Sequence, residues 1–186
     1  MQAFLDAAER LLITHGYAQI TTRRLAEEAG ANHGLIHYYF GSMEELFLQV
    51  VERFTERIHR RQRAMYEADE PFINKWRKAM NYIDEDLAAG YPKVWFELEA
   101  MAWNHPELQV RLANVHAAWR VLLSDAISQA MKGYGLDTKR FPIGAITSLV
   151  QTFNLGILFE RMIGVREGHD SLLRMIDRLL QSLEKG

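Results

Sequence analysis

Apolar residues recur every three or four positions through most of the chain, which is the spacing of one face of an α-helix. The first such stripe joins Phe4, Leu5, Ala8, Leu11 and Leu12. It predicts a helix from about residue 3 to about residue 15. The sequence shows no strand-like alternation of apolar and polar residues. The pattern therefore predicts an all-α fold.

Glycine and proline interrupt the apolar stripes and mark the ends of the predicted helices. After the first stripe, longer helices are expected over residues 42–66, 71–90, 92–103 and 106–132. A further helix opens at Pro142 and runs to a turn bracketed by Gly164 and Gly168. Asp170 or Ser171 is expected to cap the final helix.

Residues 21–47 read as two short helices joined by a tight turn and followed by the start of a long helix. Thr21 can cap the first short helix. Gly30 can end it, because glycine enters the left-handed conformation without steric cost. The second begins at residue 31 or 32 and ends at Gly41, and Ser42 with Glu45 then forms a capping box. This arrangement is typical of a helix-turn-helix.

The second short helix separates its side chains into two groups. One face is expected to dock on a small core, and it carries Leu35, Ile36, Tyr39 and Phe40. The opposite face carries His33, Gly34, His37 and Tyr38. Polar and flat aromatic side chains beside a glycine are suited to contact phosphates and base edges.

Spaced residues through the first quarter of the chain form one recognisable pattern. They are Ala7-Ala8, Leu11-Leu12, Gly16-Tyr17, Thr21-Thr22, Leu25-Ala26, Ala29-Gly30, Gly34, Tyr39-Phe40-Gly41-Ser42 and Glu44-Glu45-Leu46-Phe47. In these positions the chain resembles TetR-type transcriptional regulators. The resemblance implies a three-helix DNA-binding domain at residues 1–47 and a ligand-binding and dimerisation domain at residues 48–186. It also implies a homodimeric regulator, a repressor by expectation, that binds a palindromic DNA operator and responds to a small effector.

The resemblance also indicates which residues contact DNA. They are Thr22, Arg23, Asn32, His33, Gly34, His37, Tyr38, Tyr39, Ser42 and Met43. Two of these positions depart from the usual pattern, because His37 replaces a common tyrosine and Met43 replaces a common lysine. The second change removes an expected phosphate contact.

The charge of the chain gives no general signature of a nucleic-acid-binding protein. The net charge is −2, and residues 1–47 hold three arginines against six acidic residues, a net charge of −3. DNA contacts must therefore depend on local placement of Arg23, Arg24, hydroxyls and helix N-terminal amides. The acidic N-terminal domain and Met43 leave open an alternative, in which the protein is a ligand-binding or interaction module with weak or lost DNA binding.

The remaining helices suggest an apolar effector site and a dimer surface. Candidate pocket residues are Trp76, Met80, Trp95, Phe96, Glu99, Met101, Trp103, Trp119, Phe153 and Asn154. Aromatic and methionine stripes at helical spacing more often belong to a plain core. Glu99 or Asn154 is the expected polar contact to a lipophilic effector, because each interrupts a strongly apolar helix. The last two predicted helices carry more apolar surface than one core needs, which is consistent with a dimer interface.

Other classes of function find little support in the sequence. The chain has no cysteine, and the pairs Glu56/His59 and His33/His37 are each half of a metal motif without a second half. No nucleophile–base pair suggests an enzyme, and no cofactor is expected. No signal peptide is visible, and Gln151, Asn154, Glu160 and Arg161 interrupt the longest apolar runs. A cytoplasmic protein without a membrane span is therefore expected.

Overall fold

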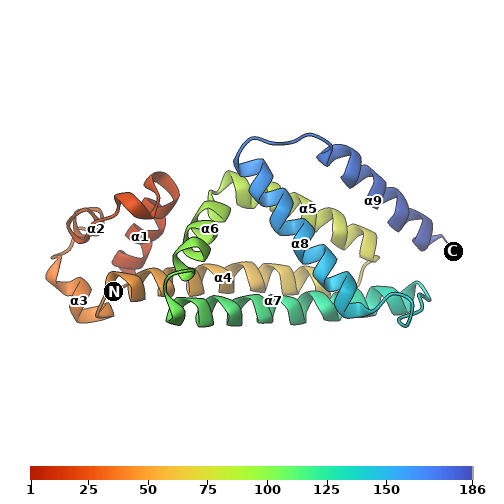
Figure 1. Ribbon diagram of the computed structural model, residues 1–186, viewed down its shortest axis with the longest axis horizontal. Coiled ribbons are helices and arrows are strands. Elements are labelled where there is room, and N and C mark those ends of the chain that lie inside the picture. The colour runs from red at the N-terminus through yellow and green to blue at the C-terminus, as the bar shows by residue number, and fades with distance from the viewer. Residues whose placement is uncertain (186) are drawn as a thin grey trace. The chain divides into compact units, whose positions relative to one another are not determined.

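The computed structural model describes residues 1–185, and within them the fold is all-α, as predicted (Figure 1). The elements are α1 (Gln2–His15), the short 3-10 helix η1 (Tyr17–Gln19), α2 (Thr22–Ala29), α3 (Gly34–Phe40), α4 (Met43–Glu67), α5 (Phe72–Ala88), α6 (Tyr91–Ala102), α7 (Pro106–Gly133), α8 (Ile143–Met162) and α9 (His169–Glu184).

The chain forms two compact units. Unit 1 contains residues 1–58 and 88–115, and therefore α1 to α3, the first part of α4, α6 and the first part of α7. Unit 2 contains residues 59–87 and the chain from residue 116 onwards, which supplies the rest of α4 and α7 together with α5, α8 and α9. The functional boundary after residue 47 stays a prediction, because these units describe packing.

Unit 1 has a dense apolar core around α1. The stripe predicted for α1 is buried, and Phe4 and Leu12 are at most 1% exposed. Leu25 from α2, Ile36 from α3 and Phe47 from α4 complete the centre of this cluster. Burying a large apolar side chain stabilises a fold by roughly 1.5–3 kcal/mol, so these residues fix how the short helices pack together.

Unit 2 has a smaller fully buried cluster. Leu123, Ile127 and Met131 on α7 form it, and side chains of the α4 end and of α8 pack against it. Thr147 on α8 is also buried, and its hydroxyl donates to the Ile143 carbonyl oxygen over 2.8 Å. On α8 and α9, the apolar side chains of Leu149, Phe159, Met175 and Leu179 lie outside this cluster and are at least half exposed.

The predicted helix caps are confirmed in the N-terminal region. The Thr21 hydroxyl accepts from the Arg24 N–H over 3.2 Å, and the Ser42 hydroxyl accepts from the Glu45 N–H over 3.1 Å. Gly30 ends α2 at φ 62° and ψ 35°. These are local interactions among residues three to four apart, which is why the sequence alone indicates them.

Two predicted helix starts were wrong by a few residues. The α3 helix begins at Gly34, because the Asn32 side chain accepts from the Gly34 N–H over 2.9 Å and holds the preceding residues outside the helix. The α9 helix begins at His169 with Gly168 as its N-cap, two or three residues before the expected cap. The His169 side chain is bound to Glu160 over 2.6 Å and is buried, and this tertiary contact holds the first turn.

The length and hydropathy of α8 also correct the sequence analysis. This helix has 20 residues and a mean hydropathy of 1.3, which is enough to cross a membrane by length and composition alone. Gln151 and Asn154 are uncharged, and Glu160 and Arg161 lie near the helix end. These four residues therefore do not lower the mean hydropathy below that of a possible membrane span. One such helix is weak evidence for a membrane span. Only 11% of the apolar stretch is buried.

Candidate nucleic-acid interface

The residues predicted to contact DNA lie mostly on the outer rim of α2 and α3 in unit 1. Seven of the ten are exposed: Arg23, Asn32, His33, Gly34, His37, Tyr38 and Tyr39. Thr22, Ser42 and Met43 are half-buried. These seven exposed residues, called the exposed rim below, are accessible to a second macromolecule.

The inner face of α3 is narrower than expected. Ile36 and Phe40 are buried, as predicted, but Leu35 is 39% exposed and Tyr39 is 42% exposed. On a seven-residue helix only one pair of positions four apart meets the core, and the neighbouring positions lie at its edges. The prediction that Leu35 and Tyr39 help dock the helix was wrong, and Tyr39 therefore remains available for contact with DNA.

Two tyrosines give the exposed rim an aromatic surface. Tyr38 is 79% exposed, and its ring meets the Tyr39 ring edge to face with centroids 5.2 Å apart. Each ring combines a flat apolar surface with a hydroxyl that can donate a hydrogen bond. The pair can therefore contact both the sugar–phosphate backbone and base edges.

His37 has a structural contact at the end of α3. Its Nδ1 lies 2.9 Å from the carbonyl oxygen of Gly41, the residue that ends the helix at φ 74°. A ring nitrogen this close to a carbonyl oxygen carries the proton and donates. The bond orients the ring and leaves Nε2 as the atom that can contact a ligand.

Ser42 and Met43 connect the rim to α4. Met43 is the first residue of that helix and packs against the core of unit 1. The Ser42 hydroxyl oxygen accepts the capping bond from Glu45, so its own proton is free to be donated elsewhere. The sequence analysis predicted the Ser42 cap, but it treated Met43 only as a contact to DNA and missed its packing against the core.

Arginines neutralise most of the acidic residues of the N-terminal region. Arg53 on α4 binds Asp6 and Glu9 over 2.6 Å each, and Arg57 also binds Glu9. These bonds join α4 to α1. The paired carboxylates therefore face guanidinium groups inside unit 1.

Further arginine–carboxylate pairs neutralise acidic residues elsewhere in unit 1. Arg111 on α7 binds Glu45 over 2.7 Å and Glu52 over 2.6 Å, and Arg10 binds Glu28 over 2.8 Å. Arg23 pairs with Glu27 over 2.9 Å, with side chains 88% and 64% exposed. Exposed pairs of this kind are worth well under about 1 kcal/mol. Arg23 can therefore leave its partner for a phosphate at little cost.

The candidate effector residues divide between the two units. Trp95, Phe96, Glu99, Met101 and Trp103 belong to unit 1, and Trp76, Met80, Trp119, Phe153 and Asn154 belong to unit 2. Trp103 is 81% exposed, so it does not line an apolar interior as expected. It follows the last residue of α6 and lies beyond the helical face that carries the core residues.

Within unit 2, several of these candidates lie among partly buried aromatic groups. The Trp76 and Phe153 rings have centroids 6.0 Å apart, and the Trp119 ring meets the His59 ring edge to face at 4.6 Å. Burial, and secondarily the charge of Arg63, lowers the pKa of His59. These contacts form a mixed aromatic environment in which a charged group is disfavoured.

The two polar candidates, Asn154 and Glu99, differ in their hydrogen bonding. Its Oδ1 atom is buried and has no hydrogen-bond partner within residues 1–185. A buried oxygen without a donor costs about 1–3 kcal/mol, which a donor on a bound molecule would recover. Glu99 lies in unit 1 and has an interaction of its own.

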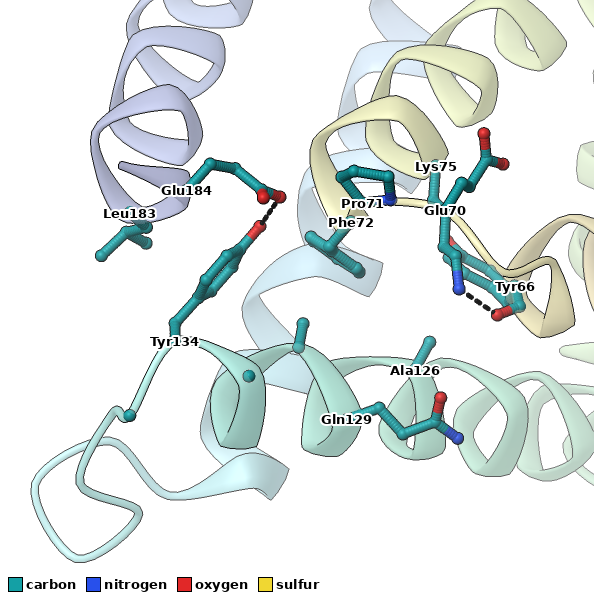
Figure 2. Close-up of a pocket in the computed structure, with 13 residues that line it drawn as sticks. Tyr66, Glu70, Pro71, Phe72, Lys75, Ala126, Gln129, Tyr134, Leu183 and Glu184 are labelled. Atoms are coloured by element: carbon teal, nitrogen blue, oxygen red, sulfur yellow. Dashed lines mark hydrogen bonds between the residues drawn. The ribbon is translucent and has the colours of Figure 1, made fainter. Parts of the chain in front are cut away.

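A pocket of about 580 Å³ lies in unit 2 and includes none of the ten candidates in its lining (Figure 2). It lies where α4 ends and α5 begins, beside the C-terminal ends of α7 and α9. The sequence analysis missed it because apolar periodicity identifies helix faces, whereas this pocket is built from helix ends and turns.

Comparison with known proteins places the N-terminal region in one family. Residues 4–50 match the sequence model of the bacterial regulatory proteins of the tetR family. The HTH-type transcriptional repressor AcnR of Corynebacterium efficiens is 39% identical over 57 residues, and the HTH-type transcriptional regulator BetI of Agrobacterium fabrum is 36% identical over 59 residues. These alignments cover 31% and 32% of the chain and 30% and 29% of the two relatives.

Longer alignments extend the likeness beyond this region. The uncharacterized HTH-type transcriptional regulator YfiR of Bacillus subtilis is 25% identical over 164 residues, which cover 83% of the chain and 76% of YfiR. The crystal structure of a TetR-family regulator from Rhodococcus sp. superposes with a TM-score of 0.75 at 21% identity over 96% of each chain. A TetR regulator from Haloarcula marismortui gives 0.76 at 18% identity over 98% of this chain and 94% of its own. At these identities the two structures show a common fold.

Proposed function

Because the chain belongs to the TetR family of bacterial regulators, we propose that it is a DNA-binding transcriptional repressor that acts as a homodimer and is released from its operator by a small effector. The observation that carries this proposal is the exposed rim of the helix-turn-helix. Seven of the ten predicted DNA contacts lie on it, and Ile36 and Phe40 anchor its helix from beneath.

In this proposal α3 enters the major groove and its exposed side chains contact bases and phosphates. Tyr38, Tyr39 and the Nε2 atom of His37 are the central contacts, and Arg23 supplies a positive charge at the edge. A dimer presents two such helices to a palindrome whose half-sites lie about one helical turn, roughly 34–36 Å, apart.

The exposed apolar side chains of α8 and α9 support a dimer interface within unit 2. The largest exposed fractions belong to Leu149 and Phe159 on α8, to Ile163 directly after it, and to Met175 and Leu179 on α9, which are 50–66% exposed. A soluble monomer rarely leaves many large apolar groups in water on neighbouring elements. A second copy of the chain would cover them, and this also gives a reason for the hydropathy of α8 without a membrane.

The effector contacts that we propose lie in unit 2. The Trp76–Phe153 pair supplies apolar surface, and Asn154 supplies the unpartnered carbonyl oxygen. An effector with a large apolar body and one hydrogen-bond donor fits these groups. We place this soluble repressor in the cytoplasm.

The direct test is binding of the purified protein to labelled DNA that flanks its own gene, measured by fluorescence anisotropy at fixed salt. We expect sequence-specific binding, and a loss of at least about tenfold for Tyr38→Ala, because a hydrogen bond to a charged group is worth about 1.5–3 kcal/mol and about 1.4 kcal/mol is a factor of ten. Val110→Ala on α7, also in unit 1 and 62% exposed, is the matched control. Equal affinity for flanking and scrambled DNA would favour the alternative of a binding module that has lost DNA recognition.

A further inference from the structure

The pocket of about 580 Å³ in unit 2 carries two opposite charges that lack charged partners (Figure 2). Its volume is in the range of small-molecule sites, roughly 300–1,000 Å³. Figure 2 shows Glu184 with Tyr134 on one side of Phe72, and Lys75 with Tyr66 on the other. The pocket therefore has two polar ends and an apolar middle.

The negative end of the pocket is the carboxylate of Glu184, near the end of α9. Its Oε1 accepts from the Tyr134 hydroxyl over 2.6 Å and from the Ile73 N–H over 3.4 Å, in the first turn of α5. Both donors are neutral, so they orient the carboxylate without cancelling its charge. Both bonds use Oε1, and Oε2 keeps its capacity to accept from a ligand.

The positive end of the pocket is the ammonium group of Lys75 on α5. It donates to the carbonyl oxygen of Tyr66 over 2.6 Å, which is again a neutral partner. An ammonium group has three donors, so two remain for a ligand. The other lining carboxylate, Glu70, is bound by Lys78 over 2.7 and 2.9 Å. Among residues 1–185, Lys75 and Glu184 are thus the lining charges that no opposite charge neutralises.

The middle of the pocket is apolar and ordered. The Phe72 and Tyr134 rings meet edge to face with centroids 6.5 Å apart, and Leu183 and Ala130 add aliphatic surface. Burial raises the pKa of Tyr66 to about 12, and burial together with the Glu184 carboxylate raises the pKa of Tyr134. Both phenols therefore stay protonated at neutral pH and add no charge to the pocket.

We propose that this pocket binds a small zwitterion whose ammonium and carboxylate groups lie at the two ends of a short apolar chain. The ligand ammonium pairs with Glu184, the ligand carboxylate pairs with Lys75, and the methylene chain lies against Phe72. A ligand with a single charge would leave one of the two protein charges unpaired. This site goes beyond the proposed function, because its residues are neither the predicted DNA contacts nor the proposed effector contacts around Asn154.

A matched set of probes tests the charge pattern by isothermal titration calorimetry on the full chain. The zwitterion 6-aminohexanoate has its charges at opposite ends, and its isomer 2-aminohexanoate has both at one end. Hexanoate and hexylamine each carry one charge on a similar chain. We expect 6-aminohexanoate to bind at least about tenfold more tightly than the other three, since each of those leaves one of the two protein charges without a charged partner. Equal binding by hexanoate, hexylamine or the isomer would overturn the proposal, as would no binding of 6-aminohexanoate.

Variants then assign the two ends of the pocket. Glu184→Gln keeps an oxygen for Tyr134 and should reduce the preference for 6-aminohexanoate over hexanoate to less than about threefold, because the charge that selects the ammonium is gone. Lys75→Met should remove the preference over hexylamine in the same way. Lys139→Met, at an exposed lysine of unit 2 outside the pocket lining, is the control and should retain wild-type selectivity.

The proposal remains testable even if one of the variants is unstable. If Lys75→Met fails to fold, the wild-type probe series and Glu184→Gln still test the proposal. Wild-type selectivity in Glu184→Gln would overturn it. DNA is absent from these titrations, so a protein that binds its operator but not 6-aminohexanoate refutes only this inference.

Discussion

Replacing Gly16 should disturb a contact that fastens α6 to the N-terminal helices within unit 1. The Glu97 carboxylate on α6 accepts from the Tyr17 N–H over 2.5 Å, at the start of η1. Gly16 has φ 78° and ψ 163°, a region that is essentially restricted to glycine. A Cβ atom at this position would lie 2.6 Å from the Oε1 atom of Glu97. Gly16→Ala therefore strains the backbone and also pushes the carboxylate away.

The two effects give an expected loss of stability. A residue forced into this region costs about 1–3 kcal/mol, and loss of a hydrogen bond to a charged group costs about 1.5–3 kcal/mol. We expect Gly16→Ala to lower the free energy of unfolding by about 2.5–6 kcal/mol in total. Gly30→Ala is the control for backbone strain, because Gly30 has φ 62° and a Cβ atom there meets nothing within 4 Å. Its cost should be about 1–2 kcal/mol.

Urea unfolding of a double-mutant cycle measures the contact separately from the strain. In a Glu97→Ala background the carboxylate is gone, so Gly16→Ala should cost only the backbone term of about 1–3 kcal/mol. The coupling between residues 16 and 97 should then be about 1–3 kcal/mol. If Gly16→Ala costs the same in both backgrounds, Glu97 does not hold this junction and the reasoning is wrong.

Three further changes test the dimer, the DNA contacts and the pH response. Met43→Lys should tighten binding to all DNA and steepen the log–log salt slope by about 0.9, measured by anisotropy from low to high salt; an unchanged slope would mean that residue 43 does not reach a phosphate. Leu179→Asp, at a position 59% exposed, should shift the protein towards monomer in light scattering, whereas Val110→Asp should not; a persistent dimer would exclude this interface. The pKa of His59 is lowered from 6.5, so the neutral ring is favoured in the folded state. The resulting stabilisation is present above pH 6.5 and should be lost as the pH falls through the lower pKa of the folded state. His59→Phe should weaken that dependence in thermal unfolding between pH 8 and 5, and an unchanged profile would assign it to another group.

The parts of the fold that depend on neighbouring residues were predictable from the sequence. The caps at Thr21 and Ser42 and the glycine that ends α2 involve residues three or four apart. A short segment of the sequence therefore contains all the residues needed to predict each of them. The width of the buried face of α3 was not predictable in the same way. It depends on how much core lies beneath a seven-residue helix, and only Ile36 and Phe40 reach that core.

The pocket in unit 2 shows a second limit of reading periodicity. Glu184 lies 50 residues from Tyr134 and 111 residues from Ile73, yet one of its oxygens binds both. Nothing in the local pattern around residue 184 distinguishes it from an ordinary solvated helix end. Contacts between distant helix ends arise from the packing of the whole unit, so the candidate effector residues chosen by helical spacing missed this pocket.

Long-range pairing also changes the meaning of the acidic N-terminal region. A net charge of −3 over residues 1–47 argues against DNA binding if each carboxylate acts alone. In the folded protein Asp6, Glu9 and Glu45 are bound by arginines that lie 47, 44 and 66 residues away. A carboxylate held against a guanidinium group projects a dipole, whose field falls faster with distance than that of a bare charge. In the complex that we propose, the exposed rim of α3 approaches phosphates, and affinity comes from the tyrosines, imidazoles and hydroxyls of that rim, with Arg23 as a mobile cation at its edge.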